Sequence, residues 1–399
     1  MRRLPTRTGD ATTLRRPAFL SVALLLMIIV FGSCSGPQEP APTETVRGLN
    51  WTQIPLPDSV AASSLTPRVD ELLVGGLASA GGDHPVLFDV DQTGTARPVP
   101  LQPNSPYAKV ADLVSVAARG ERVVALGAAH GGAHANFRWT VWAASTKRLI
   151  EHPQTFETFG GQSAGALLDI VFTSEGPAIA GTWAAREGGL DAAVWLPRGQ
   201  RWFRQNSAGT ALANTPQLQV APRAASAAGQ AMIIMGSVIT FADGVEQRAT
   251  IWVWPTHNSP WLLQQLPDAG THSEALSSAC GQMCWVSGHV DDTVAVWSFD
   301  PVHADETARR NSTLPSMQIA TDGPGPRTIL SGDQPAVIFS HNGDTRLLVR
   351  DSHNGWQAFS APAGSVLDAT SIGDRLYAII KINNTVGLWS TDLAATRPR

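Results

Sequence analysis

The sequence predicts an all-β fold, a seven-bladed β-propeller of four-stranded antiparallel blades. A short apolar strand centred on one large side chain recurs seven times, and each copy follows a second apolar strand and a turn rich in Gly, Asn and Asp. The central residues lie 54, 53, 57, 45, 52 and 40 residues apart and are Phe88, Trp142, Trp195, Trp252, Trp297, Val349 and Trp389. A period near 50 residues is typical of one propeller blade. Repetition also allows 399 residues to fold together, since a single core usually stops growing at about 250 to 300.

Within each repeat, the four strands follow in a fixed order. Innermost strands are represented by "GALLDIVF" and "SVLDATSI", and second strands by "ELLVGG", "RVVALG", "PAIAGT", "AMIIMG", "MCWVSG", "PAVIFS" and "LYAIIK". Turns such as "HVDD", "HNGD" and "INN" then lead into the third strand, because Asn and Gly tolerate the positive φ of tight hairpins. A weaker fourth strand begins at Trp202, Trp261 and Trp356 in three copies. The loose period-2 alternation indicates sheets that are buried on both faces.

The last repeat lacks its outermost strand, because the chain ends "LWSTDLAATRPR". The segment "NWTQIPLP", residues 50–57, matches the outer strands "GWQAFSAP" and "PWLLQQLP". We therefore expect an N-terminal strand to complete the last blade and close the ring within a propeller domain at 49–399. The recurring Trp residues are expected between adjacent blades, where a large ring fills apolar space. The repeats resemble the degenerate propellers of many exported bacterial proteins over about 345 residues, without a specific family signature.

Residues 1–33 have the features of a signal peptide. Five arginines precede an apolar run from Ala18 to Phe31, which is shorter than the roughly 20 residues of a membrane span. The following Cys34 ends "FGSC", which resembles the lipobox of bacterial lipoproteins. That resemblance implies cleavage before Cys34 and attachment of lipid, such as palmitate, at the outer face of the bacterial cytoplasmic membrane. The Pro-rich residues 34–48 would form a tether. Simple secretion and an uncleaved signal anchor are the alternatives.

The other two cysteines, Cys280 and Cys284, occur in "CGQMC". Hairpin spacing and an even number of remaining cysteines predict a disulfide in an oxidising compartment. A zinc site would need two further ligands, so no metal is predicted here.

The loops between second and third strands contain the candidate binding residues. The expected binding face consists of His84, His130, His134, Glu187, Asp191, Asp243, Glu246, His289, Asp291, Asp292, His341 and Asp344. Turn formation alone also favours Asp and Asn at such positions. The pair of histidines in "HGGAH", residues 130–134, lies in an expected loop, so its spacing fixes no metal geometry.

Charge argues against a nucleic-acid partner. Net charge is −4, and removal of the first 33 residues leaves 24 basic against 32 acidic residues, or −8. Nucleic-acid binding draws much of its affinity from basic side chains that neutralise phosphates. A monomer is favoured, with no cofactor.

The sequence gives little support for nucleophilic catalysis, and no pair of acids stands out for glycoside hydrolysis. "RDSHNGW", residues 350–356, resembles the Asp-box of sialidase-like propellers, although its Ser and Asp are in the other order. We therefore expect a binding or scaffolding module for a protein, peptide or glycan at the cell envelope, with no catalytic residue assigned. An exported enzyme of the glycoside hydrolase or lyase type, using loop carboxylates, and a structural subunit of an envelope complex are the alternatives.

Overall fold

The computed structural model describes residues 45–396 except 132–135, 146–147, 243 and 321–322. The predicted signal peptide, Cys34, most of the tether, His134 and Asp243 lie outside the described residues. The chain from Glu44 to Arg399 forms one unit. In its described part, no helix has the length and apolar character needed to cross a membrane.

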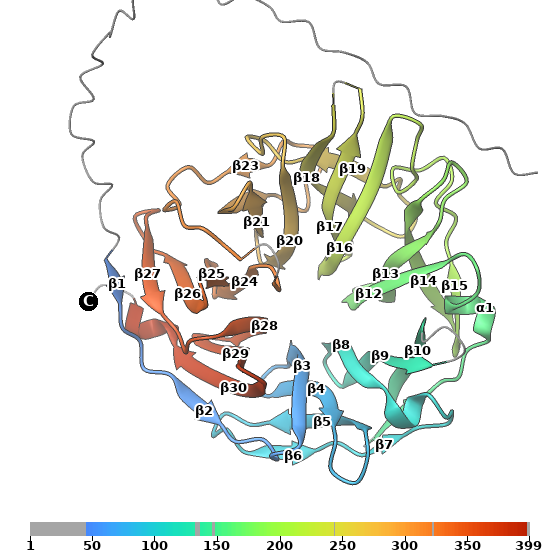
Figure 1. The fold of residues 1–399 in the computed structure, drawn as a ribbon, viewed down its shortest axis with the longest axis horizontal. Coiled ribbons are helices and arrows are strands. Elements are labelled where there is room, and N and C mark those ends of the chain that lie inside the picture. Colours follow the sequence, from blue (N-terminus) through green and yellow to red (C-terminus); the bar gives the residue numbers. More distant parts are fainter. Residues whose placement is uncertain (1–44, 132–135, 146–147, 243, 321–322, 397–399) are drawn as a thin grey trace, which may run out of the picture. The chain divides into compact units, whose positions relative to one another are not determined.

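Seven sheets surround a central channel in the order of the sequence, as Figure 1 shows. From the channel outward, blade 1 consists of β3 (Val60–Pro67), β4 (Leu72–Ala78), β5 (His84–Val90) and β6 (Ala96–Pro98). Blade 2 consists of β8 (Asp112–Arg119), β9 (Arg122–Gly131), β10 (Asn136–Ser145), β11 (Arg148–Glu151) and the added outer strand β7 (Leu101–Gln102). Blade 3 consists of β12 (Ala164–Thr173), β13 (Gly176–Ala184), β14 (Leu190–Arg198) and β15 (Arg201–Arg204).

The remaining four blades repeat this meander. Blade 4 contains β16 (Leu218–Ala228), β17 (Ala231–Thr240), β18 (Glu246–Trp254) and β19 (Leu262–Gln265). Blade 5 contains β20 (Ser273–Cys280), β21 (Cys284–Val290), β22 (Thr293–Phe299) and β23 (Arg309–Arg310). Blade 6 contains β24 (Arg327–Ser331), β25 (Gln334–His341), β26 (Asp344–Arg350), β27 (Trp356–Ser360) and the outer β1 (Val46–Arg47). Blade 7 contains β28 (Ser365–Ile372), β29 (Arg375–Ile382), β30 (Thr385–Asp392) and β2 (Thr52–Ile54).

This architecture confirms the predicted seven-bladed propeller. All seven aligned residues lie on third strands, and second strands such as β21 and β25 are buried on both faces by adjacent blades. Among the described residues, helical structure is limited to η1 (Ala108–Val110) and α1 (Phe156–Phe159) in the connections and η2 (Leu393–Thr396) after the last strand.

Ring closure by the N-terminal strand is also confirmed. The strand β2 pairs antiparallel with β30, with Ile54 opposite Leu388, and completes blade 7. Its neighbour Trp51 donates its indole N–H to the carbonyl of Ser360 at 3.0 Å. The short β1 adds a parallel edge strand to β27 of blade 6, a pairing that the repeat pattern does not predict. The first described strand, β1, therefore belongs to blade 6, and the last strand, β30, belongs to the adjacent blade 7.

The repeated Trp residues fasten the connections between blades as well as filling the core. Trp195, Trp252 and Trp297 are fully buried, and each donates its indole N–H to a carbonyl in the crossover that enters its own blade. These N–H to O distances are 2.9, 2.9 and 2.8 Å. One side chain thus packs two blades together and fixes the crossover between them.

The innermost strands bulge at one common position, which decides the side chains that face the channel. The register shifts at this point in six of the seven blades, for example between Ala275 and Ser277. The second strand often has Gly opposite the bulge: a Cβ on Gly288 would lie 1.9 Å from the carbonyl oxygen of Glu274. The Gly that ends several second-strand motifs therefore makes room for the bulge.

Candidate functional site: the ring face and the central channel

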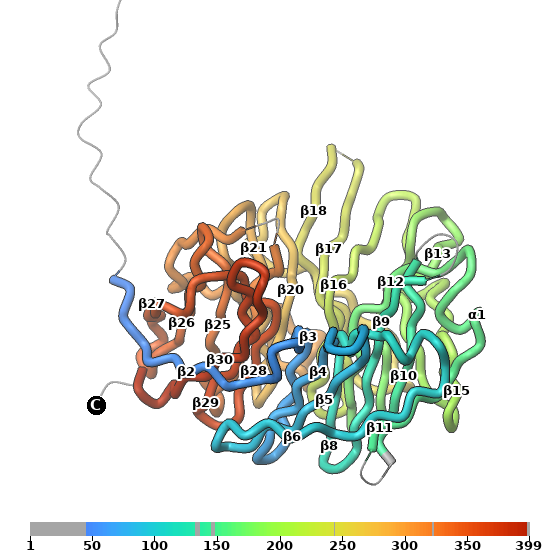
Figure 2. The backbone as a smooth tube through the Cα atoms, turned by 60° about the horizontal axis from the view of Figure 1, so that its bottom comes forward, coloured from blue at the N-terminus to red at the C-terminus, as the bar shows by residue number. Residues whose placement is uncertain are grey.

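Because consecutive strands of a blade run in opposite directions, the connections between them alternate between the two faces of the ring. Turns between second and third strands share one face with the crossovers between blades, and we call it the hairpin face. The β17–β18 hairpin projects furthest on this face (Figure 2). Turns between first and second strands, and between third and fourth strands, lie on the opposite face.

On blades 5 to 7 the hairpin face is built from two-residue turns. Asp291, Asn342 and Asn383 begin these turns with φ of 49°, 49° and 55°. Asp and Asn tolerate this left-handed conformation better than most residues. The predicted binding residue Asp291 is therefore explained by its turn, while Asp292 accepts the N–H of Ile319 through its backbone carbonyl.

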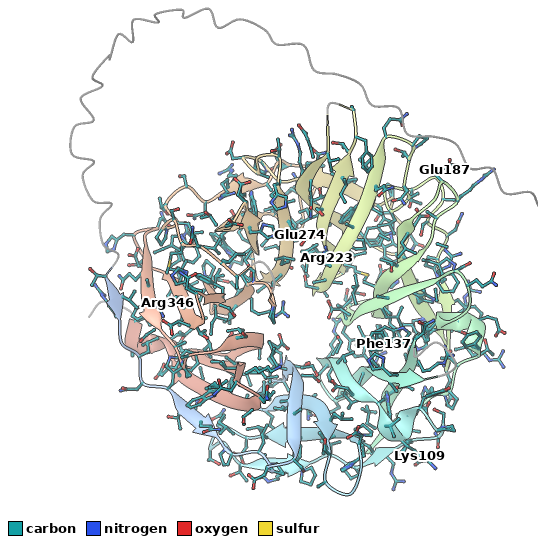
Figure 3. All side chains as sticks on the ribbon, in the orientation of Figure 1. Lys109, Phe137, Glu187, Arg223, Glu274 and Arg346 are labelled. Carbon is teal, nitrogen blue, oxygen red and sulfur yellow. A yellow bond between two sulfur atoms is a disulfide. The ribbon has the colours of Figure 1, made fainter. Side chains whose placement is uncertain are left out.

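The other predicted binding residues are distributed over six blades and do not converge. Several make local contacts: Asp191 accepts the backbone N–H of Asn214 at 2.7 Å, and Glu246 and Asp344 pair with Arg248 and Arg346. The imidazoles of the exposed His84, the partly buried His341 and the buried His289 donate to backbone carbonyls. Glu187 points outward from blade 3 (Figure 3). Among the described residues, no group of three or more His, Cys, Asp or Glu could hold a metal.

Exposed apolar side chains gather on one half of the hairpin face. Of the twelve large apolar residues that are exposed in the described chain, seven lie on the hairpins of blades 2 to 4 or on the crossovers into blades 2 and 3: Tyr107, Val110, Phe137, Phe156, Leu190, Phe241 and Val245. Phe137 is 46% exposed and its ring centroid lies 4.3 Å from His130 and 5.4 Å from Trp139. We call these seven residues the apolar half-face.

Arg138 adds a cation to this half-face. Its guanidinium carbon lies 5.8 Å from the ring centre of Tyr107 and 4.9 Å from that of Phe156. Gly131 permits the packing of Tyr107, because a Cβ there would come within 2.3 Å of the Tyr107 ring. Aromatic rings and arginine are the side chains that most often dominate binding energy in protein interfaces.

The central channel contains a polar cavity of about 800 Å³, lined by the innermost strands of all seven blades. Its charged lining residues are Asp169, Arg223, Arg327 and Asp368, among many Ser and Thr side chains. At the mouth, Arg223 donates to Glu274 at 2.7 Å, and Figure 3 shows the two residues beside the central opening. Glu274 also accepts Gln247 at 3.2 Å, so this ion pair is tied into blade 4.

Three of the channel charges occupy one repeat position. The position next to the bulge holds Ser64, Ser115, Asp169, Ala224, Ser277, Arg327 and Asp368 in blades 1 to 7. In four blades its side chain accepts the backbone N–H of the next innermost strand: Ser115 from Ile170, Asp169 from Ala225, Ser277 from Thr328 and Asp368 from Leu65. These hydrogen bonds join neighbouring blades at the channel wall.

Arg327 links blade 6 to blade 7. Its Nε and Nη2 donate to the carbonyl of Leu367 at 3.1 and 2.8 Å, and its Nε lies 3.6 Å from Asp368 Oδ1. Asp368 in turn accepts the N–H of Leu65 from blade 1 at 2.7 Å. The bridge therefore spans blades 6, 7 and 1 at the closure of the ring.

Burial raises the pKa of Asp368 to about 6, because the loss of water disfavours the charged form more than Arg327 and two backbone N–H groups favour it. The nearby charge of Asp169 adds to this rise, and burial raises the pKa of Asp169 too. Since the folded pKa exceeds the ordinary 3.8, the charged carboxylate destabilises the fold above about pH 6, and this cost disappears toward pH 4.

We expect Asp368→Ser to gain stability relative to the wild type as pH rises. Serine can still accept the N–H of Leu65, as Ser115 and Ser277 do in their blades. The free energy of unfolding of the variant, minus that of the wild type, should increase by up to about 3 kcal/mol between pH 4 and pH 7.5. Urea titrations at both pH values measure this difference, and Ser277→Ala should show no such trend. A difference independent of pH would contradict the prediction.

The sequence pattern does not predict the channel residues, although the strands that contain them are recognisable. "GALLDIVF" and "SVLDATSI" each place an Asp within an otherwise apolar innermost strand. Two such Asp residues at one repeat position are the signal that could have identified the channel. Without the bulge, however, alternation does not tell which side chains face it.

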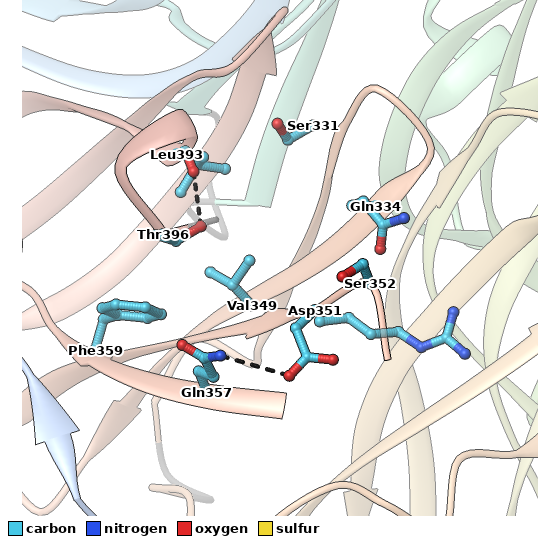
Figure 4. A pocket seen from close by; sticks show the side chains of 10 residues that line it. Ser331, Gln334, Val349, Asp351, Ser352, Gln357, Phe359, Leu393 and Thr396 are labelled. Carbon is cyan, nitrogen blue, oxygen red and sulfur yellow. Dashed lines mark hydrogen bonds between the residues drawn. The ribbon is translucent and has the colours of Figure 1, made fainter. Parts of the chain in front are cut away.

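A second cavity, of about 370 Å³, lies on the opposite face beside the turn "RDSHNGW" (Figure 4). Asp351 Oδ1 accepts the N–H groups of His353 and Gly355, and these hydrogen bonds lower its pKa. Asn354 adopts a positive φ of 67°. The motif that resembles an Asp-box therefore forms a compact turn, and its carboxylate is engaged by the turn's own backbone.

The predicted cysteine pair lies on the same face of the ring as this second cavity, at the β20–β21 turn. Cys280 and Cys284 face each other at the β20–β21 turn with their sulfur atoms 2.00 Å apart, so the pair can form the predicted disulfide. Cys280 also lines the channel cavity.

Comparison with known proteins identifies the fold only. No family model and no curated protein matches the sequence. Among solved structures, an acylaminoacyl peptidase is similar at 9% identity and TM-score 0.51, over 84% of this chain and 52% of that chain. A prolyl endopeptidase is similar at 12% identity and TM-score 0.50, over 86% and 48%. The propeller domain of the Trilobed protease from Pyrococcus furiosus gives 8% identity and TM-score 0.48, over 84% and 95%. The chain thus spans about half the length of the acylaminoacyl peptidase and of the prolyl endopeptidase.

Proposed function

We propose that this chain is a binding or scaffolding propeller at the bacterial cell envelope, held by lipid on Cys34 and presenting the apolar half-face to a partner protein or peptide, or to a glycan. The observation that carries the proposal is the concentration of exposed aromatic and apolar side chains on blades 2 to 4. Exposed apolar patches of this kind mark interaction sites on soluble domains. Arg138, held over two rings, supplies a cation within the same patch.

The proposal predicts that a partner is lost when the half-face is changed. The full chain should be crosslinked in its native membrane, captured and analysed by mass spectrometry. We expect a partner captured by the wild type to decrease at least tenfold with Phe137→Ser combined with Phe241→Ser. Val69→Ser combined with Val302→Ser is the matched control, since both valines are more than 80% exposed on the opposite face. Equal capture by both variants would refute the assignment of this face.

A second candidate function is an exported enzyme, and the channel carboxylates favour it. Cleavage of a glycosidic bond uses two carboxyl groups, one of which must be protonated. Asp169 and Asp368 both line the channel, and the raised pKa of Asp368 would suit a proton donor. Against this role, both carboxylates accept backbone N–H groups that join blades. Polysaccharide turnover that is abolished by Asp368→Ser, in the absence of any captured partner, would favour the enzyme.

A further inference from the structure

The charges in the channel exceed what the ring needs to hold its blades together. Ser115 and Ser277 accept the N–H of the next blade with a neutral hydroxyl. Asp169 and Asp368 make the same contact in blades 3 and 7 with a carboxylate. Since serine meets the structural requirement at this repeat position, the negative charge of the two aspartates calls for another explanation.

Only part of that negative charge is neutralised inside the channel. Arg223 is paired with Glu274 at the mouth, and Arg327 lies 3.6 Å from Asp368 and binds the carbonyl of Leu367. Asp169 accepts the N–H of Ala225 at 2.7 Å and the hydroxyl of Ser115 at 3.3 Å. Within the described chain, no Lys, Arg or His lies at ion-pair distance from Asp169. One carboxylate therefore faces the cavity without a direct ionic partner.

We propose that the channel binds the ammonium or guanidinium group of an organic ligand at Asp169, within the field of Asp368. The cavity of about 800 Å³ has room for a ligand with a flexible stem, and its Ser and Thr side chains offer further hydrogen bonds. Arg327 lies 3.6 Å from Asp368 and acts on Asp169 only at longer range, so a bound cation would give Asp169 a direct ionic partner. This site is separate from the apolar half-face, so it does not depend on the partner proposed for that face.

The same arrangement disfavours a divalent metal ion. Calcium takes six to eight oxygen ligands, and magnesium requires near-octahedral coordination. The two aspartates belong to blades 3 and 7, each already accepts two hydrogen bonds, and Arg327 brings a positive charge to the same channel. A singly charged nitrogen group, which needs one carboxylate and a few neutral acceptors, fits these residues better.

Titration calorimetry on the purified full chain tests the inference, with 1,5-diaminopentane and L-argininamide as probes and 1,5-pentanediol as the uncharged analogue. We expect saturable binding of at least one cationic probe and none of the diol. Asp169→Ser should weaken that binding at least tenfold, and Asp368→Ser should also weaken it. Ser226→Ala, which alters the channel lining without changing its charge, should stay within twofold of the wild type. Melting curves confirm that each variant is folded.

Arg327→Gln provides a test with the opposite sign. Removal of the internal guanidinium leaves both carboxylates to the ligand, so we expect the cationic probe to bind more tightly. A purely structural role for the three charges would not produce tighter binding. The proposal is overturned if neither cationic probe saturates the wild type, if folded Asp169→Ser binds as well as the wild type, or if calcium chloride binds in place of the amines with the same dependence on both aspartates.

Discussion

Deletion of residues 50–57 should lower the melting temperature by roughly 10 °C. The deletion removes β2, which buries Ile54 against blades 7 and 1, together with the Trp51 indole bond to Ser360. It also removes the backbone carbonyl of Asn50, which accepts the Thr391 hydroxyl at 2.9 Å. A loss of roughly 7 kcal/mol, divided by an unfolding entropy of about 2.1 cal/mol/K per residue over about 350 residues, gives this shift.

Point variants on adjacent residues separate ring closure from chain length. Ile54→Asp places a charge in the buried contact and should reproduce most of the loss. Gln53→Ala changes an exposed side chain on the same strand and leaves the pairing with Trp389 intact, so its melting temperature should stay within about 1 °C. Differential scanning calorimetry gives all three values. An unchanged melt after the deletion would show that β2 does not hold the ring closed.

The repeats could be predicted because each blade solves the same packing problem with similar residues. The buried ring of Trp252, the Gly opposite the bulge at Gly288 and the left-handed turn at Asn342 all leave a local pattern in the sequence. Closure by residues 50–57 could be predicted for the same reason, since this strand resembles the outer strands of other blades. The two-residue β1 has no such pattern, and its pairing with β27 depends on the closed ring.

The candidate site could not be predicted as well, because its charges act through positions that only the folded ring defines. Asp169 and Asp368 lie about 200 residues apart in sequence and face one channel because six of the seven innermost strands share a bulge. The polarity of loop residues such as Asp291 suggests a binding role, but the same polarity suits the backbone of a turn. Polarity alone therefore identifies turns. The residues that face the channel are known only from the folded positions of the innermost strands.

Replacement of Trp297 by Ala should lower the free energy of unfolding by about 3 to 5 kcal/mol. Its ring is fully buried between blades 4 and 5, its indole N–H binds the carbonyl of Pro267 at 2.8 Å, and the guanidinium of Arg310 lies 4.8 Å from its ring centre. The substitution would therefore leave a void at a position where one side chain supports both a blade interface and a crossover. Denaturant titration, followed by the fluorescence of the other Trp residues, measures the loss.

Two conservative variants divide that loss between packing and hydrogen bonding. Trp297→Phe keeps an aromatic ring but leaves the Pro267 carbonyl without its donor, which should cost about 1 to 3 kcal/mol. Trp389→Phe is the matched control in blade 7, because among the described residues no acceptor lies within hydrogen-bond reach of the Trp389 indole nitrogen. It should therefore cost less than Trp297→Phe. Equal losses from both would mean that the crossover bond adds nothing, and that the recurring Trp stabilises the propeller through its buried surface alone.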